Sequence, residues 1–294
     1  MSDYVISCCS SADLNKETLE KYDLKCKSFS YSLDGVSYVD DFGQTVPYDE
    51  FYAKMEAGAD TSTSQINSEE YAEYFRPFLE AGLDIIHVTL SSGLTGTFNS
   101  CRIAKEDLEE EFPDRKIYIV DSLGASGGHG LLMMTLADMK KNGASIDEVY
   151  DFAEKNKLRC QHWFFSTDLK YYIRGGRISK TAGFVGNLLN ICPLLNMDDE
   201  GHLIPRMKVR TKRKVKEEIV NKMKEHAENG VDYSGKVYIT HSACLEDAED
   251  VAALIKETFP NVKDIPIWYI GSTVGAHTGP GTVALFFWGD VRVR

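Results

Sequence analysis

The chain has 294 residues, of which 43% are hydrophobic and 27% charged, and its formal net charge is −12. This composition is ordinary for a soluble globular protein with one large or two modest domains, and the negative charge argues against a nucleic-acid partner. No apolar run approaches the roughly 18 residues that cross a bilayer, so no stable membrane insertion is expected. The N-terminal residues lack a signal-peptide pattern, which favours a cytoplasmic protein.

The charge is divided unevenly along the chain. Residues 1–166 hold 15 Lys and Arg against 29 Asp and Glu, a net of −14, whereas residues 167–294 have a net of +2. This asymmetry indicates two domains with a boundary near residue 166. The seven cysteines are scattered without a C-x-x-C pair, so we expect reduced thiols and neither a disulfide framework nor a metal site.

The first half alternates strands with amphipathic helices, a pattern that predicts βαβ units and a Rossmann-like domain with a mainly parallel sheet. Ser68 is the expected N-cap of one of these helices, and Pro77 should kink it. A polar stretch at residues 58–67 is expected to form a loop. We predict strands at residues 4–7, 24–29, 35–39, 83–90 and 116–120, and helices at residues 46–54, 69–81, 98–111, 131–141 and 145–156.

The second half predicts a second α/β domain, residues 167–294, with a mixed sheet and helices. A hairpin is expected around residues 198–201, and a glycine-rich loop at residues 271–282. We predict helices at residues 168–174, 181–190, 212–228 and 246–258, and strands at residues 193–197, 202–210, 236–240, 265–270 and 283–288.

Two clusters of hydroxyl side chains, at residues 61–64 and 91–97, each precede a predicted helix. Free backbone N–H groups at a helix N-terminus, together with hydroxyl donors, favour an anion such as a carboxylate or phosphate. Thr63 and Thr95 are the preferred donors, supported by Ser64, Ser92 and the backbone at Gly96. The alternative is that these residues only cap the helices.

Three cationic or titratable side chains could complete such a site. His277 lies in the glycine-rich loop, where it could donate a hydrogen bond to an oxyanion or serve only a structural role. Arg177 follows a Gly-Gly pair that Arg174 precedes. Arg210 ends a predicted strand within a basic run, most of which we interpret as a solvated face.

A competing interpretation is a serine hydrolase or esterase. Gly124-Ala-Ser126-Gly-Gly128 matches the nucleophile-elbow pattern G-x-S-x-G, and Asp198 and His277 follow in the order of a triad. Against it, the preceding strand ends too early and no HGGG-type segment is present. The sequence also contains no P-loop, G-x-G-x-x-G or H-E-x-x-H motif.

Six short motifs in the same order resemble those of the DegV family, the bacterial fatty-acid-binding proteins that include the FakB type. The resemblance spans nearly the whole chain, which makes it far more specific than any single motif. It is carried by Thr63-Ser-Gln65, Ser91-Ser-Gly-Leu-Thr-Gly-Thr97, Val120-Asp-Ser122, Gly175-Gly-Arg-Ile178, Lys208-Val-Arg210 and Gly275-Ala-His-Thr-Gly-Pro-Gly281.

The resemblance implies a two-domain carrier, not an enzyme, that needs no cofactor and binds a long-chain fatty acid. The carboxylate would be held by the hydroxyls of Thr63 and Thr95, with Arg177, Arg210 and His277 around it. A separate ATP-dependent fatty acid kinase would then form the acyl phosphate used in phospholipid synthesis. A purely regulatory interaction module is a third possibility.

The sequence departs from the family pattern at two positions. Cys9 stands where the first strand commonly ends in Asp, and Ile66 stands where the T-S-Q segment is usually followed by Pro. Both departures could reshape the first loop and the preference for particular acyl chains.

Overall fold

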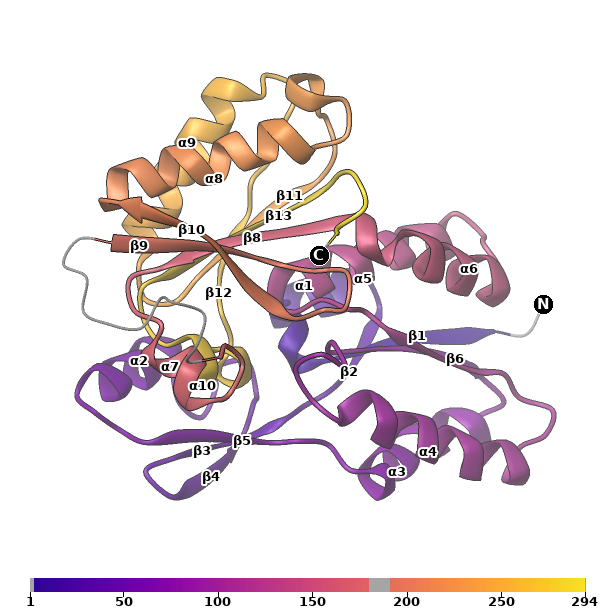
Figure 1. Ribbon diagram of the computed structural model, residues 1–294. Coiled ribbons are helices and arrows are strands. Elements are labelled where there is room, and N and C mark those ends of the chain that lie inside the picture. The colour runs from indigo at the N-terminus through magenta and orange to yellow at the C-terminus, as the bar shows by residue number, and fades with distance from the viewer. Residues whose placement is uncertain (1–2, 180–190, 294) are drawn as a thin grey trace.

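The computed structural model describes residues 3–179 and 191–293, and its first half is built on a parallel four-stranded sheet (Figure 1). The strand order is β2-β1-β6-β7, and helices cover both faces of the sheet: α3 and α4 pack on one face, α5 and α6 on the other. The strands are β1 (Tyr4–Cys9), β2 (Leu24–Lys27), β6 (Asp84–Thr89) and β7 (Ile117–Asp121), and the helices are α1 (Lys16–Lys21), α3 (Ser68–Glu80), α4 (Thr97–Glu111), α5 (Ser126–Lys141) and α6 (Ile146–Asn156).

A six-stranded sheet of order β10-β9-β8-β13-β11-β12 forms the second half, and its only parallel pair among the described strands is β11–β12. Helices α8 and α9 cover one face, while α5 packs against the opposite face and so lies between the two large sheets. The elements are β8 (Cys160–Ser166), β9 (Ile191–Met197), β10 (Leu203–Arg210), β11 (Val237–His241), β12 (Ile267–Tyr269), β13 (Thr282–Trp288), α8 (Lys212–His226) and α9 (Leu245–Thr258).

The structure confirms the predicted fold class, a parallel α/β sheet followed by a mixed sheet with helices. Because β8 pairs with β9 and β13, the second sheet begins at Cys160, ahead of residue 166. No helix in residues 3–179 or 191–293 is long and apolar enough to cross a bilayer.

A third, antiparallel sheet of order β4-β3-β5 joins the two halves. Its core, centred on Phe51 and Tyr52, includes Tyr171 and Ala276 from the second half of the chain. The layer thereby brings β5 against α10, although most of the sequence separates them. The elements are β3 (Ser30–Leu33), β4 (Val36–Val39), β5 (Thr61–Ser64), α2 (Tyr48–Glu56), α7 (Lys170–Arg174) and α10 (Ser272–Thr278), and short 3-10 turns occur at Ser10–Ala12, Lys157–Arg159 and Gly230–Asp232.

Two predicted loops contain regular structure. The hydroxyl-rich stretch at residues 58–67 includes β5, because its threonines and serines pair through their backbones with β3. The stretch at residues 271–282 includes α10, whose C-cap is Gly279 with a φ of +67°. Polar and glycine-rich composition predicted loops at both places, but contacts with neighbouring layers order the backbone.

Helix boundaries also differ from the predictions. The N-cap of α3 is Asn67, whose side chain forms a capping box with Glu70, while Ser68 is the first helical residue. Helix α5 begins at Ser126, because its glycines allow close contact: a Cβ at Gly128 would lie 2.1 Å from His162 Nε2. The helix predicted at residues 181–190 lies outside the described residues.

Candidate functional site

A cavity of about 390 Å³ is lined by residues from β5, the turn before α4, the start of α5, one face of the six-stranded sheet and α10. Its size is within the range of small-molecule sites. One part of the lining is polar and consists of Thr63, Ser64, Gln65, Thr95, Gly96, Arg177 and His277. Much of the rest is apolar, and includes Phe29, Leu90, Leu94, Phe164, Met197, Leu203, Ile270, Val274, Ala284 and Phe286.

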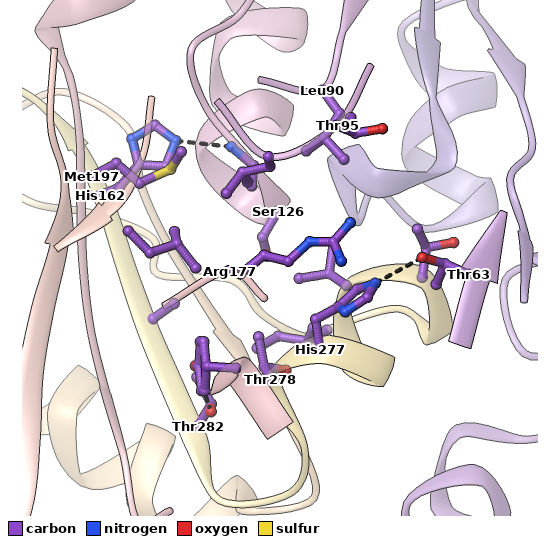
Figure 2. A pocket seen from close by; sticks show the side chains of 18 of the residues that line it. Thr63, Leu90, Thr95, Ser126, His162, Arg177, Met197, His277, Thr278 and Thr282 are labelled. Atoms are coloured by element: carbon purple, nitrogen blue, oxygen red, sulfur yellow. Dashed lines mark hydrogen bonds between the residues drawn. The ribbon is translucent and has the colours of Figure 1, made fainter. Parts of the chain in front are cut away.

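At the polar end, His277 Nε2 lies 2.7 Å from Thr63 Oγ1 (Figure 2). Burial, with further contributions from Arg177 and Arg174, lowers the pKa of His277 to about 4. The imidazole is therefore neutral at pH 7 and carries one N–H. With that proton on Nε2, the ring donates to Thr63 Oγ1, and the threonine hydroxyl is free to donate to a ligand.

Arg177 supplies positive charge to the same end of the cavity. Its guanidinium extends between Thr95 and His277 in Figure 2, and Nη1 donates to the carbonyl oxygen of Gly175. Burial lowers the pKa of Arg177, and within the described part of the chain its guanidinium pairs with no carboxylate. A partly buried cation without a counter-ion favours an anionic ligand.

The turn before α4 presents the second threonine. Thr95 Oγ1 lies 3.0 Å from Thr97 Oγ1 and accepts the Thr97 backbone N–H at 3.4 Å. When Thr97 also donates its hydroxyl proton, the hydroxyl proton of Thr95 remains available for an anion.

Gln65, which sequence reasoning did not select as a site residue, connects this turn to β5. Its Nε2 donates to Ser100 Oγ on α4 at 2.9 Å. A Cβ added at Gly96 would lie 2.8 Å from Gln65 Oε1, so glycine lets the two walls of the site approach each other. The T-S-Q segment contained this residue, but nothing in its composition indicated which element it would contact.

Two predicted site residues lie elsewhere. Ser92 is exposed, and its backbone N–H donates to Asp121 Oδ1. Arg210 is exposed at the end of β10, opposite Ile191. Neither belongs to the described lining of the cavity, whereas Thr63, Ser64, Thr95, Gly96, Arg177 and His277 all do.

The two departures from the family pattern lie in the core between α3 and the parallel sheet. Cys9 Sγ is 3.2 Å from Tyr71 Oη, and Ile66 is only 2% exposed. Neither side chain belongs to the described lining of the cavity.

Ser126 has one property of a nucleophile elbow, a positive φ of 53°, and it lines the cavity. Its Oγ, however, lies 3.0 Å from Thr240 Oγ1. His277 is engaged with Thr63, and Asp198 Oδ1 instead accepts two backbone N–H groups within its own hairpin. The proposed triad of Ser126, Asp198 and His277 is therefore not assembled. The described residues also contain no cluster of metal-ligating side chains.

Comparison with known proteins places these features in a family. Residues 6–290 match a family model described as uncharacterised proteins of the DegV family. A DegV domain-containing protein of Clostridium perfringens is 40% identical over 292 residues, covering 99% of both chains. A fatty acid-binding protein of Thermotoga maritima is 33% identical and covers 93% of both chains. The crystal structure of a stearic acid-binding protein from Eubacterium ventriosum has a TM-score of 0.85 and 27% identity, with coverage of 96% of this chain and 97% of that one.

Proposed function

This chain belongs to the DegV family, and from that premise we propose that it is a fatty-acid carrier that binds one long-chain fatty acid in the cavity. The observation that carries the proposal is the division of the lining into a polar end and a largely apolar remainder, with an Arg177 guanidinium at the polar end that pairs with no carboxylate of the described residues. A fatty acid has the same division between head and tail. The similar proteins named for fatty acid or stearic acid binding support this choice of ligand.

In the proposed complex, the carboxylate accepts hydrogen bonds from the hydroxyls of Thr63 and Thr95. Arg177 supplies the opposite charge, and His277 orients Thr63. Ser64 and the backbone at Gly96 complete the polar end. Charge-assisted hydrogen bonds of this kind are each worth about 1.5–3 kcal/mol. The carboxylate contacts therefore fix the orientation of the ligand, and removal of any one donor should measurably lower its affinity.

The tail supplies most of the affinity. Transfer of each CH₂ group from water to an apolar lining contributes about 0.8 kcal/mol. For an acyl chain of a dozen or more methylenes, the summed transfer free energy therefore exceeds the entropic cost of ordering the chain.

We further propose that the protein presents the bound carboxylate to a separate ATP-dependent fatty acid kinase in the cytoplasm. A carboxylate oxygen would attack the γ-phosphorus of ATP, releasing ADP and leaving an acyl phosphate for phospholipid synthesis. The chain itself contains no P-loop, in keeping with a division of labour between carrier and kinase. Arg210 is exposed outside the described cavity lining, and we assign it to the docking surface for the kinase.

Two measurements test these two parts separately. Displacement of a fluorescent fatty acid by palmitate tests binding, and failure of palmitate to displace the probe would exclude the carrier function. Acyl-phosphate formation by the kinase from the host organism tests presentation. Arg210→Glu should retain palmitate binding and reduce acyl-phosphate formation; unchanged formation would exclude Arg210 from the docking surface.

A further inference from the structure

The floor of the cavity is one face of the six-stranded sheet, and its residues follow the period of two expected for strands. Thr282, Ala284 and Phe286 on β13 line the cavity, as do His162 and Phe164 on β8. The intervening residues face α8 and α9 instead. The side chains of the floor therefore form successive rows, one after another along the strands.

Strand register places four side chains of this face in one row. His162 pairs with Phe286, and Leu203 pairs with Met197. The pairing of Trp163 with Asn196 brings His162 level with Met197 on the adjacent strand. The row Leu203–Met197–His162–Phe286 thus crosses four neighbouring strands, and all four residues line the cavity.

The next row along the same face contains a small side chain, that of Ala284. Ala284 lies opposite Phe164, and it is the small residue between Thr282 and Phe286 on β13. Beyond it, Thr282 Oγ1 is hydrogen-bonded to Ser166 Oγ at 3.1 Å and to Tyr172 Oη at 3.0 Å. The opposite direction leads over Ala284 to the row of large side chains.

His162 gives this row a rigid, apolar surface despite its imidazole. Nδ1 lies 2.9 Å from the carbonyl oxygen of Cys160, and Nε2 accepts the backbone N–H of Ala125 at 3.3 Å. Both ring nitrogens are therefore satisfied by the backbone. In Figure 2, His162 and Met197 lie together, across the cavity from Thr63 and His277.

The hairpin that carries Met197 and Leu203 is held in place at its tip. Ser91 Oγ donates to the carbonyl oxygen of Gly201 at 2.8 Å, and Arg292 Nη1 donates to that of Asp198 at 2.8 Å. Ser91 belongs to the same turn as Thr95, one of the proposed carboxylate donors. The row is thereby held at a fixed distance from the polar end.

From this arrangement we infer that the row Leu203–Met197–His162–Phe286 is the end wall of the acyl site, and that Met197 sets the longest straight chain that fits. The inference rests on the proposed fatty-acid function and adds the residues that select chain length. Ala284 is the residue over which the acyl chain crosses the sheet.

The test compares affinities for straight-chain saturated fatty acids from dodecanoic to docosanoic acid in steps of two carbons. Met197→Ala removes three heavy atoms from the end wall and should move the preferred chain about two carbons longer, with about a tenfold change in relative affinity between acids two carbons apart. Ala284→Leu should move the preference to shorter chains. Leu194→Ala is the matched control, because Leu194 is equally buried on β9 but faces α8.

Opposite shifts in Met197→Ala and Ala284→Leu, with no shift in Leu194→Ala, support the end wall. If Met197→Ala does not fold, Met197→Val should give a smaller shift in the same direction. Unchanged preference in folded Met197 variants that still bind fatty acids would overturn the end wall and leave the carrier function intact. Absence of binding of every chain by the unsubstituted protein would instead remove the carrier function itself.

Discussion

Thr63 and His277 are separated by 214 positions in the sequence, yet Thr63 Oγ1 lies 2.7 Å from His277 Nε2. The contact exists because β5 packs against α10 where the small antiparallel sheet joins the two halves of the chain. Neither residue alone indicates an anion site. Together with Arg177, they form a polar end that combines a hydroxyl, a neutral imidazole and a cation.

Arg177 should contribute to ligand affinity and little to folding. Because its guanidinium makes no ion pair in the described part of the chain, Arg177→Met removes a partly buried charge that a bound carboxylate would neutralise. We expect palmitate affinity to fall about tenfold to hundredfold, the range for loss of a charge-assisted hydrogen bond. Calorimetric titration measures the affinity, and thermal unfolding without ligand should show no loss of stability.

Arg210→Met is the matched control for Arg177→Met, since Arg210 lies outside the described cavity lining. Its palmitate affinity should equal that of the unsubstituted protein. Equal losses in the two variants would point to general electrostatic attraction and contradict a specific role for Arg177.

The hydroxyl of Thr95 is predicted to bind the carboxylate directly. Thr95→Val retains the shape of the side chain and removes its hydroxyl, so palmitate affinity should fall about tenfold to hundredfold, as for any hydrogen bond to a charged group. The control is Ser92→Ala, which removes an exposed hydroxyl from the same turn. If Thr95→Val binds palmitate normally, the turn serves another purpose, and a regulatory interaction module becomes the better interpretation.

Gly175 is predicted to set the position of His277. A Cβ at this residue would lie 2.4 Å from His277 Nδ1, while its φ of −73° and ψ of −7° suit alanine. Gly175→Ala should therefore fold, displace the imidazole from Thr63 and weaken palmitate binding. In the displaced, more hydrated position, the pKa of His277 should rise from about 4 towards 6.5, which NMR titration of the ring detects.

A double-mutant cycle separates this effect from general disruption. In a His277→Ala background, Gly175→Ala has no imidazole to displace, so it should cause little further loss of affinity. An equally large loss in that background would show that Gly175 acts independently of His277.

The unliganded protein should lose stability as the pH falls from about 6.5 to about 4. The pKa of His277 is about 4 in the folded protein, whereas an unfolded histidine has a pKa near 6.5. In that window the unfolded chain binds more protons, so the stabilisation is complete above pH 6.5 and is lost by about pH 4. The contribution of His277 is on the order of 3 kcal/mol.

Denaturant unfolding across this pH range measures the loss. Buried His87 and His129, whose pKa values burial lowers to about 3 and about 4, contribute in the same direction. His277→Gln should reduce the slope of stability against pH. An unchanged slope in His277→Gln would contradict the lowered pKa of His277.

Much of the fold was predictable because strand and helix periods are local. The parallel first sheet and the mixed second sheet follow from apolar runs and amphipathic repeats that can be recognised in the sequence. The start of α5 and the helix α10 were missed because their glycines serve close packing: Gly128 makes room for His162, a neighbour that only the tertiary structure reveals.

The candidate site was predicted in part for the same reason. Thr95, Arg177 and His277 stand close to glycines and Thr63 stands in a run of hydroxyl side chains, and both patterns indicate functional loops locally. Gln65 and the row of side chains around Met197 depend on strand register and on contacts between distant elements. Ser92 and Arg210 have suitable chemistry, but their side chains lie on the surface.

Native mass spectrometry of the purified, unsubstituted protein detects a bound ligand without any assumption about the site. We expect a mass increment of one long-chain fatty acid per chain, released on denaturation, identifiable by lipid extraction and diminished in Arg177→Met. A protein that carries no such increment, and acquires none after incubation with palmitate, would contradict the assignment of this cavity to a fatty acid.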